Sequence, residues 1–347
     1  MGVDAFMNKF TVGLPISPKH GFIEKIVEYK SRISEVYFSW SSFPGGRSAQ
    51  TADEDALPWE AEAKLIEALR YLRDEGLHFN LLFNANCYGA ESLSRSLFMK
   101  IGEAVDYIAT EFGLDSVTTT SPIIAGFIKD NFAGIKTRAS VNMEIGSVNG
   151  MDYLADKFDG YYMKREYNRN FPVIKELRSW CDAHGKGLYM LANSGCLNNC
   201  SAHIFHDNLV AHEAEMAKYD NAYKFSGICH GYLKRPGNVE QYLRVTNFIR
   251  PEDLHLVANY FDGIKLATRV NPNPAALLDS YMKGSYRGQV TSLLEPDHSG
   301  VFYPAVIENS KIDGHYTETV LSCNKRCAEC GYCIEACKKA IIKLEEL

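Results

Sequence analysis

The sequence predicts an α/β protein: a (β/α)₈ barrel of the TIM type, followed by a small cysteine-rich, ferredoxin-like extension at the C-terminus. Two observations support the barrel. Eight short apolar segments alternate with longer amphipathic segments between residues 10 and 285, which is the size and rhythm of such a barrel. In addition, no G-x-G-x-x-G follows the first apolar segment, which disfavours the competing open sheet of dinucleotide-binding proteins.

The predicted strands are short apolar runs that end in polar or turn-forming residues. They are FTVGLP (10–15), EVYFSW (35–40), FNLLFNANC (79–87), SVTTTS (116–121), IKTRASVN (135–142), GYYMKRE (160–166), GLYMLANS (187–194) and GIKLATRV (263–270). Helical stretches lie between most of them, for example WEAEAKLIEALRYLRDEG (59–76) and SRSLFMKIGEAVDYIATEFG (94–113). Several of these stretches end in glycine, which commonly caps a helix C-terminus.

The rhythm breaks after residue 285. We therefore assign residues 1–285 to the barrel and residues 286–347 to a C-terminal extension that holds a cysteine cluster. Residues 286–322 are expected to be irregular or to form a small β structure. The chain has 347 residues, 46% of them hydrophobic, which is enough to bury a substantial core.

Composition restricts the compartment and the partners. The net charge of −6 argues against general nucleic-acid binding. The first residues, MGVDAFMNKFTVG, lack the features of a secretory signal and the Ser or Thr that N-myristoylation needs. The sequence also contains no run of eighteen apolar residues, the length that a membrane-spanning helix requires. We expect a cytoplasmic protein, whose ten cysteines serve metal or redox chemistry rather than disulfides. Cys181, within a helical pattern, is interpreted as a small buried hydrophobic residue.

The tail holds five thiols in fifteen positions: Cys323, Cys327, Cys330, Cys333 and Cys337. The last four have the C-x₂-C-x₂-C-x₃-C spacing of bacterial ferredoxins, which predicts a [4Fe–4S] cluster. Zinc is the alternative, but it favours two separated C-x₂-C pairs. The first three also have the C-x₃-C-x₂-C spacing of radical-SAM enzymes, a match that we interpret as coincidence because almost no chain follows it.

A second thiol group is predicted where the strands of the barrel end. Cys196 and Cys200 follow the seventh strand, and Cys229 follows in FSGICHGYLK. We therefore expect the chain to bind one or two [4Fe–4S] clusters. Three arrangements remain open for the mouth cluster: Cys87 completes it, a tail cysteine completes it, or three cysteines hold it and leave one iron open as a Lewis acid. His203, His206 and His212 lie just beyond and could face the same site.

Other strand ends supply the remaining candidate residues, because active sites of this fold gather there. Arg165 and Glu166 are the predicted catalytic pair. The predicted substrate-binding residues are Lys265, Arg269, Asn193 and Tyr88. The cations would hold an anionic group of the substrate, Glu166 would act as acid or base, and the ring of Tyr88 could stack on an unsaturated ring.

The segment from residue 158 to 200, with its Arg-Glu pair and cysteine-bearing loop, resembles peptidase family U32, and YFDGIKLATR resembles a later segment of that family. The resemblance covers residues 10 to 285. It implies a (β/α)₈-like barrel with cysteine-bound iron–sulfur at its mouth, as in the oxygen-independent ubiquinone- and RNA-hydroxylation members. It further implies that Cys196, Cys200 and Cys229 are cluster ligands and that Arg165, Glu166, Lys265 and Arg269 line the pocket.

These observations predict an iron–sulfur redox enzyme that hydroxylates or similarly converts a small molecule or a modified nucleotide without oxygen. An electron-donor protein is an expected partner, whereas membranes are not. The alternatives are an electron-transfer or assembly subunit and a non-redox iron–sulfur hydrolase or desulfurase. Peptidase activity is not expected, because the chain has neither an H-E-x-x-H nor a G-x-S-x-G motif.

Overall fold

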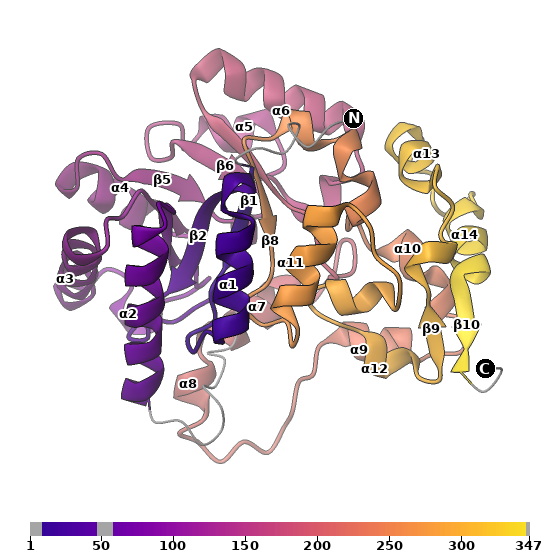
Figure 1. Ribbon diagram of the computed structural model, residues 1–347, viewed down its shortest axis with the longest axis horizontal. Helices are drawn as coiled ribbons and strands as arrows, with labels where there is room; N and C mark the ends of the chain where they lie inside the picture. The colour runs from indigo at the N-terminus through magenta and orange to yellow at the C-terminus, as the bar shows by residue number, and fades with distance from the viewer. Residues whose placement is uncertain (1–8, 47–57, 345–347) are drawn as a thin grey trace.

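Eight parallel strands form a closed barrel in chain order in the computed structural model, which describes residues 9–46 and 58–344 (Figure 1). The strands are β1 Phe10–Gly13, β2 Ile33–Ser39, β3 Phe79–Phe83, β4 Ser116–Thr119, β5 Lys136–Ala139, β6 Gly160–Tyr162, β7 Gly187–Leu191 and β8 Gly263–Leu266. Pairing of β1 with β8 closes the ring. The predicted fold class is confirmed. The expectations about a secretory signal and N-myristoylation concern mainly residues 1–8, which lie outside the described residues.

Helices follow the strands as the pattern predicts. They are α1 His20–Glu28, α2 Pro58–Asp74, α3 Arg95–Glu111, α4 Pro122–Asn131, α5 Val148–Asp152, α6 Phe171–His184, α7 His203–Ala211, α8 Glu213–Met216, α9 Ile228–Leu233, α10 Tyr242–Val245, α11 Pro274–Lys283, α12 Ser299–Phe302, α13 Tyr316–Ser322 and α14 Tyr332–Ala340. At the start of α3, the side chain of Ser94 accepts a hydrogen bond from the Leu97 amide. At the end of α6, Gly185 adopts a φ of 63°, the left-handed conformation that glycine tolerates best.

The connection from β7 to β8 departs from the regular alternation. Instead of one helix, residues 192–262 contain α7 to α10 and several single turns. This insertion carries Cys196, Cys200 and Cys229. Figure 1 shows α9 and α10 to one side of the barrel, next to the C-terminal extension.

The barrel interior is polar toward the N-terminal ends of the strands. Glu35 on β2 pairs with Arg138 on β5, and its two carboxylate oxygens also accept hydrogen bonds from Asn80 (3.2 Å) and Ser116 (3.1 Å). The Arg138 guanidinium lies 4.4 Å from the centre of the Tyr189 ring. The hydrogen bonds around this buried ion pair satisfy its charges inside the barrel.

The C-terminal extension packs against the β7–β8 insertion. Its strands β9 Ala305–Ile307 and β10 Ile341–Lys343 form a two-stranded antiparallel sheet, so one strand falls within the stretch expected to be irregular or small β. Helix α14 packs on α10 and on the turn at Val239–Gln241 (Figure 1). The domain boundary at residue 285 stays a prediction.

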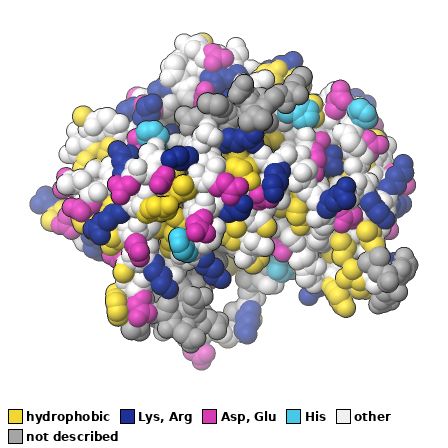
Figure 2. All heavy atoms as spheres, in the orientation of Figure 1, with side chains coloured by type: hydrophobic (Ala, Val, Ile, Leu, Met, Phe, Trp, Pro, Cys, Tyr) yellow, Lys and Arg dark blue, Asp and Glu magenta, His cyan; other side chains and the backbone are white. Residues whose placement is uncertain are grey.

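The distribution of surface charge and the character of the helices relate to two possible partners, nucleic acids and membranes. On the face shown in Figure 2, basic and acidic side chains lie interspersed over the barrel helices and the extension. Within the described parts of the chain, no helix combines the length and the apolar character that crossing a membrane requires.

Candidate active site at the barrel mouth

A cavity of about 50 Å³ lies at the C-terminal ends of the barrel strands. Three of the cationic residues predicted from the sequence, Arg165, Lys265 and Arg269, line it together. The other lining residues are Tyr37, Gly46, Leu82, Asn84, Val141, Asn142, Leu191, Ala267, Val270 and Glu295. The cavity therefore combines several cations with an apolar wall, a composition suited to a small molecule that carries an anionic group.

Lys265 is held over aromatic rings. It belongs to β8 and is buried, with Nζ 3.8 Å from the ring centre of Tyr37 and 5.2 Å from that of Tyr162. The Tyr37 hydroxyl donates a hydrogen bond to the Leu266 carbonyl at 2.8 Å, and burial raises the pKa of Tyr37 to about 12. The phenol thus stays neutral at physiological pH, and its ring face attracts the ammonium group.

Arg165 connects the cavity to the thiols. It follows β6 in the turn Arg165–Tyr167 and is only 3% exposed. Its Nη2 donates to Oδ1 of Asn142 at 3.1 Å, whereas its Nη1 lies 3.5 Å from Sγ of Cys196. One guanidinium therefore contacts both the cavity lining and the loop that carries the first thiol.

The thiols of Cys196, Cys200 and Cys229 lie close enough to affect one another's pKa, although Cys229 comes from the separate helix α9 and the three sulfur atoms do not all lie within 4.8 Å of one another. Burial is the main cause that raises the pKa of Cys200 and of Cys229, and the neighbouring Cys196 thiol raises both further. All ten cysteines lie in the described residues, and none forms a disulfide. Three half-buried thiols that interact electrostatically are a donor set suited to iron–sulfur or another soft metal centre.

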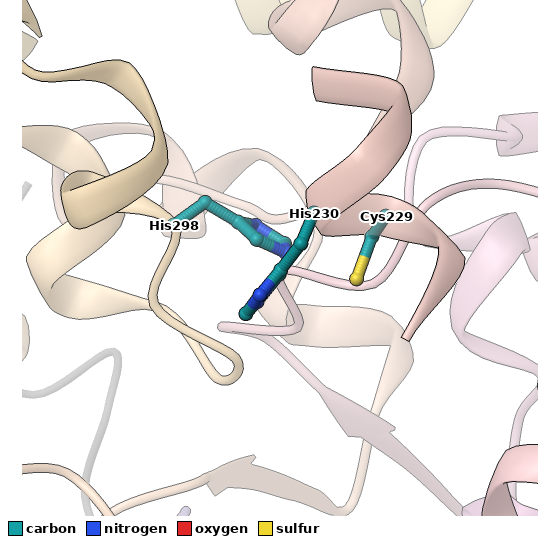
Figure 3. Close-up of side chains that lie close together, drawn as sticks. All are labelled: Cys229, His230 and His298. Atoms are coloured by element: carbon teal, nitrogen blue, oxygen red, sulfur yellow. The ribbon is translucent and has the colours of Figure 1, made fainter. Parts of the chain in front are cut away.

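Two histidines adjoin this group. Figure 3 shows Cys229 and His230 on α9 and His298 on a separate loop, with their side chains directed toward a common space. Their candidate ligand atoms lie within 4.8 Å of one another. His298 is fully buried, its Nδ1 is 3.2 Å from the Tyr242 hydroxyl oxygen, and burial is the main cause that lowers its pKa to about 4.

Sequence reasoning missed both histidines. His230 directly follows Cys229, so the Cys-His dipeptide was a signal that could have been used. His298 lies in the C-terminal extension, and no local pattern links it to the β7–β8 insertion. Only the packing of the extension onto that insertion brings it to the site.

Glu166, which was expected to line the cavity with the three cations, does not line it. It lines the larger cavity beside the tail thiols and belongs to an acidic group. Its carboxylate is within 4.8 Å of ligand atoms of Glu144 and His203, and its Oε2 is buried without a hydrogen-bond partner among the described residues. His203 Nδ1 lies 2.5 Å from Oε1 of Glu144, and this contact is the main cause that lowers the pKa of Glu144 to about 2. His203 is thus placed beside Glu166.

The other two candidate histidines have different neighbours. His206 packs its ring against Phe225, with ring centres 5.4 Å apart. His212 lies 3.2 Å from the carboxylate of Glu215. Neither residue lines the cavity at the barrel mouth.

Asn193 is placed differently from the cations. It is fully buried, and its amide bonds the backbone: Nδ2 donates to the carbonyls of Ala267 (3.3 Å) and Leu293 (2.8 Å), and Oδ1 accepts from the Ala267 amide (2.7 Å). This side chain ties the end of β7 to the segment after β8 and to the extension. It does not line the cavity.

Cys87 and Tyr88 follow β3 and also lie outside the cavity lining. Sγ of Cys87 accepts a hydrogen bond from the Gly89 amide at 3.3 Å. The Tyr88 hydroxyl is buried, and burial is the main cause that raises its pKa. Participation of Cys87 as a cluster ligand stays a prediction.

The tail forms a second thiol group. Cys323, Cys327 and Cys333 line a cavity of about 430 Å³ between the extension and the β7–β8 insertion. Burial is the main cause that raises the pKa of Cys333, and the Cys327 and Cys323 thiols raise it further. Cys330 is exposed.

Cys337 faces the insertion. It is fully buried, its Sγ lies 3.4 Å from the Val239 carbonyl oxygen, and burial raises its pKa to about 11. The cavity that the other tail thiols line is also bordered by three cationic residues, Arg169, Arg244 and Lys325.

Tyr242 begins α10, the helix on which α14 and its Cys337 pack. This fully buried side chain has a pKa well above its usual value, mainly because of burial. Its hydroxyl oxygen lies 3.2 Å from Nδ1 of His298, so Tyr242 also adjoins the group at the barrel mouth.

Comparison with known proteins gives two informative similarities, and no family model matches the chain. A protein of Methanocaldococcus jannaschii named as an uncharacterized protease, MJ1657, is 25% identical over 282 residues, which span 80% of this chain and 81% of the relative. The solved structure of the U32 peptidase Mk0906 is similar with a TM-score of 0.53 at 14% identity, over 74% of this chain and 91% of that chain. The structural similarity shows a shared fold.

Proposed function

We propose that this chain, a U32-like protein, is an iron–sulfur-dependent redox enzyme that converts a small anionic molecule or a modified nucleotide at the barrel mouth. One observation carries the proposal: Arg165 lines the cavity and also lies 3.5 Å from Sγ of Cys196. A substrate held by this arginine would be next to a metal centre held by the cysteines.

Cys196, Cys200 and Cys229 would hold the mouth cluster. Their proximity and partial burial fit such a group, because thiolates bind iron and a bound metal replaces the proton that a buried thiol otherwise keeps. The tail thiols would hold a second [4Fe–4S] cluster: Cys323, Cys327, Cys330, Cys333 and Cys337 are the candidate ligands. When bound, such clusters accept and supply single electrons.

The residues of the chain would bind and orient the substrate. Lys265, Arg269 and Arg165 offer charge-assisted hydrogen bonds to a carboxylate or phosphate. The apolar wall, including Leu82 and Leu191, excludes water and strengthens these contacts. Glu166, whose Oε2 has no hydrogen-bond partner among the described residues, lies outside the cavity lining, so it would act as acid or base toward a part of the substrate that extends beyond the cavity.

The tail cluster would pass electrons from a donor protein to the mouth. Cys330 is exposed, so a donor could approach the tail from solvent. Tyr242 is on α10, which packs on the helix that carries Cys337, and its hydroxyl oxygen lies 3.2 Å from Nδ1 of His298, beside Cys229. These contacts support a short route between the two thiol groups.

A hydrolase is the second candidate. The ligand atoms of Glu144, Glu166 and His203 lie within 4.8 Å of one another, and carboxylate–histidine groups of this kind hold divalent ions that activate water. The names of the relatives, an uncharacterized protease and a U32 peptidase, favour the same reaction class.

One experiment separates these functions. Anaerobically purified protein is incubated with a mixture of small carboxylates, nucleosides and peptides, with and without dithionite, and products are identified by mass spectrometry. A product that requires reductant and disappears in Cys196→Ser and Lys265→Met supports the redox enzyme. Peptide cleavage without reductant that survives in Cys196→Ser but not in Glu144→Gln supports the hydrolase. Product only after a donor protein is added would instead support the electron-transfer role.

A further inference from the structure

We propose that His298 is a nitrogen ligand of the metal centre at the barrel mouth, so that three cysteines and one histidine bind it. The inference rests on the proposed function in one respect, namely that this centre is an iron–sulfur cluster. It assigns the fourth ligand of this centre. The sequence had suggested either a fourth cysteine or no fourth protein ligand at all.

The first argument is position. The ring of His298 and the thiol of Cys229 are directed toward a common space, and their ligand atoms lie within 4.8 Å of each other (Figure 3). The loop that carries Cys196 is joined to the segment just before His298, because the Gly195 amide donates a hydrogen bond to the Glu295 carbonyl at 2.8 Å. His298 therefore adjoins the group of three cysteines, although it comes from the loop that precedes α12.

The second argument is an unsatisfied nitrogen. His298 is 0% exposed, and its Nε2 has no hydrogen-bond partner among the described residues. Leaving a buried polar atom without a partner is energetically unfavourable, so such atoms are rare and call for a reason. A metal ion bound to Nε2 would supply the missing partner.

The third argument is orientation of the ring. The Tyr242 hydroxyl oxygen lies 3.2 Å from Nδ1 of His298 and can accept its N–H. Histidines that bind metals usually have the other ring nitrogen held in this way, because the bond fixes both the tautomer and the direction of the ring. Tyr242 is itself fully buried, with its ring 5.8 Å from that of His298.

His230 is the competing ligand and supplies a matched control. Its ring packs edge-on against His298 with centres 5.6 Å apart, and its ligand atom also lies within the 4.8 Å group. However, His230 is only partly buried, whereas His298 is fully buried and has an unsatisfied nitrogen. We therefore assign ligation to His298.

A neutral imidazole in place of a thiolate has a chemical consequence. It removes one negative charge from the cluster, which favours the reduced state and raises the reduction potential, as it does in clusters where histidines replace cysteines. The C-terminal extension would then supply a ligand to the barrel-mouth centre in addition to its own tail cluster.

The test uses the full-length Cys330→Ser/Cys333→Ser protein, in which the mouth cluster gives the spectrum, labelled with ¹⁵N-histidine. After reduction with dithionite, pulsed electron paramagnetic resonance should detect a ¹⁵N coupling typical of a directly bound imidazole. The coupling should persist in His230→Ala and be lost in His298→Cys, which keeps the cluster with a lower reduction potential. A cluster without ¹⁵N coupling, or a coupling lost in His230→Ala and kept in His298→Cys, overturns the inference while the iron–sulfur proposal stands.

A protein that binds no iron or sulfide would instead contradict the proposed function. Ligation by His298 is then measured with cobalt(II), whose visible absorption reports its ligands. Cobalt binding weakened at least tenfold by His298→Ala, and not by His230→Ala, supports the histidine ligand. Equal binding by both variants and by the parent protein overturns it.

Discussion

The guanidinium of Arg165 lies 3.5 Å from Sγ of Cys196 and, through its other nitrogen, 3.1 Å from Oδ1 of Asn142. The first contact faces the thiol group, and Asn142 belongs to the cavity lining. Because both contacts involve one rigid planar group, we expect a change in charge at the thiols to affect how Arg165 is held at the cavity.

Replacing Arg165 tests this connection. In Arg165→Met we expect an unchanged iron content but a reduction potential of the mouth cluster that is more negative, on the order of tens of millivolts, because hydrogen bonds and positive charge near cluster sulfur stabilise the reduced state. Arg165→Lys, which keeps the charge, should show a smaller shift. Potentials are measured by a redox titration followed by electron paramagnetic resonance. Arg70→Lys, on the exposed part of α2, is the control, and an equal potential in all three variants would refute the coupling.

The two thiol groups should bind metal independently. Cys330→Ser/Cys333→Ser and Cys196→Ser/Cys200→Ser should each lower iron and acid-labile sulfide by about four per chain, whereas the combination should remove both clusters. Cys181→Ala is the matched control, because this buried thiol on α6 packs against α5, with Sγ 3.9 Å from the sulfur of Met151. A loss of all iron in either pair would show a single shared centre instead.

Asn193 is expected to affect stability rather than chemistry. Asn193→Ala removes three hydrogen bonds to buried backbone groups, so the free energy of unfolding should fall by about 2–4 kcal/mol. Asn131→Ala is the control: this exposed asparagine bonds one carbonyl, that of Phe127, and its loss should cost less than about 1 kcal/mol. Urea unfolding measures both. Equal effects would mean that Asn193 does not anchor the strand ends.

The raised pKa of Tyr37 gives a pH-dependent prediction. Its pKa is about 12 in the folded protein and about 10 when unfolded, so its contribution to stability is complete below pH 10 and is lost as the pH rises toward 12. Tyr37→Phe should be less stable than the wild type by about 1–2 kcal/mol at pH 7, because the hydrogen bond to Leu266 is lost. At pH 11 the difference should shrink by about 1.4 kcal/mol, since only the wild type has this group to titrate.

Denaturant unfolding at both pH values measures the difference in free energy of unfolding between the wild type and Tyr37→Phe. The other tyrosines are present in both proteins, so their titration cancels in this difference. Tyr153→Phe, at a side chain that is 75% exposed, should change stability little at either pH. A constant difference between Tyr37→Phe and the wild type would contradict the burial of the Tyr37 hydroxyl.

The barrel was predictable because its signal is local. Each strand is a short apolar run, and helices such as α3 and α6 combine a helical period with a capping serine or glycine. The resemblance to family U32 is confirmed. The β7–β8 insertion was not predicted in detail, because its short helices lack a long amphipathic period.

The site was predictable only in part, for physical reasons that differ among residues. Strand-end position correctly brings Arg165, Lys265 and Arg269 to one cavity, but it does not determine where a side chain points. Asn193, for example, lies at the predicted end of the barrel, but its side-chain amide bonds the backbone and does not line the cavity. His298 depends on a long-range contact between the extension and the insertion, which no local pattern encodes. The metal, the substrate, the electron donor and the cytoplasmic location remain predictions.

The most direct measurement is the metal content of full-length Cys330→Ser/Cys333→Ser protein purified without oxygen. If the thiols of the barrel mouth hold an iron–sulfur cluster, this brown protein contains about four iron atoms and four acid-labile sulfides per chain, and both are lost when Cys196 and Cys229 are also replaced by Ser. A colourless protein, or one that contains zinc in place of iron and sulfide, would contradict the account.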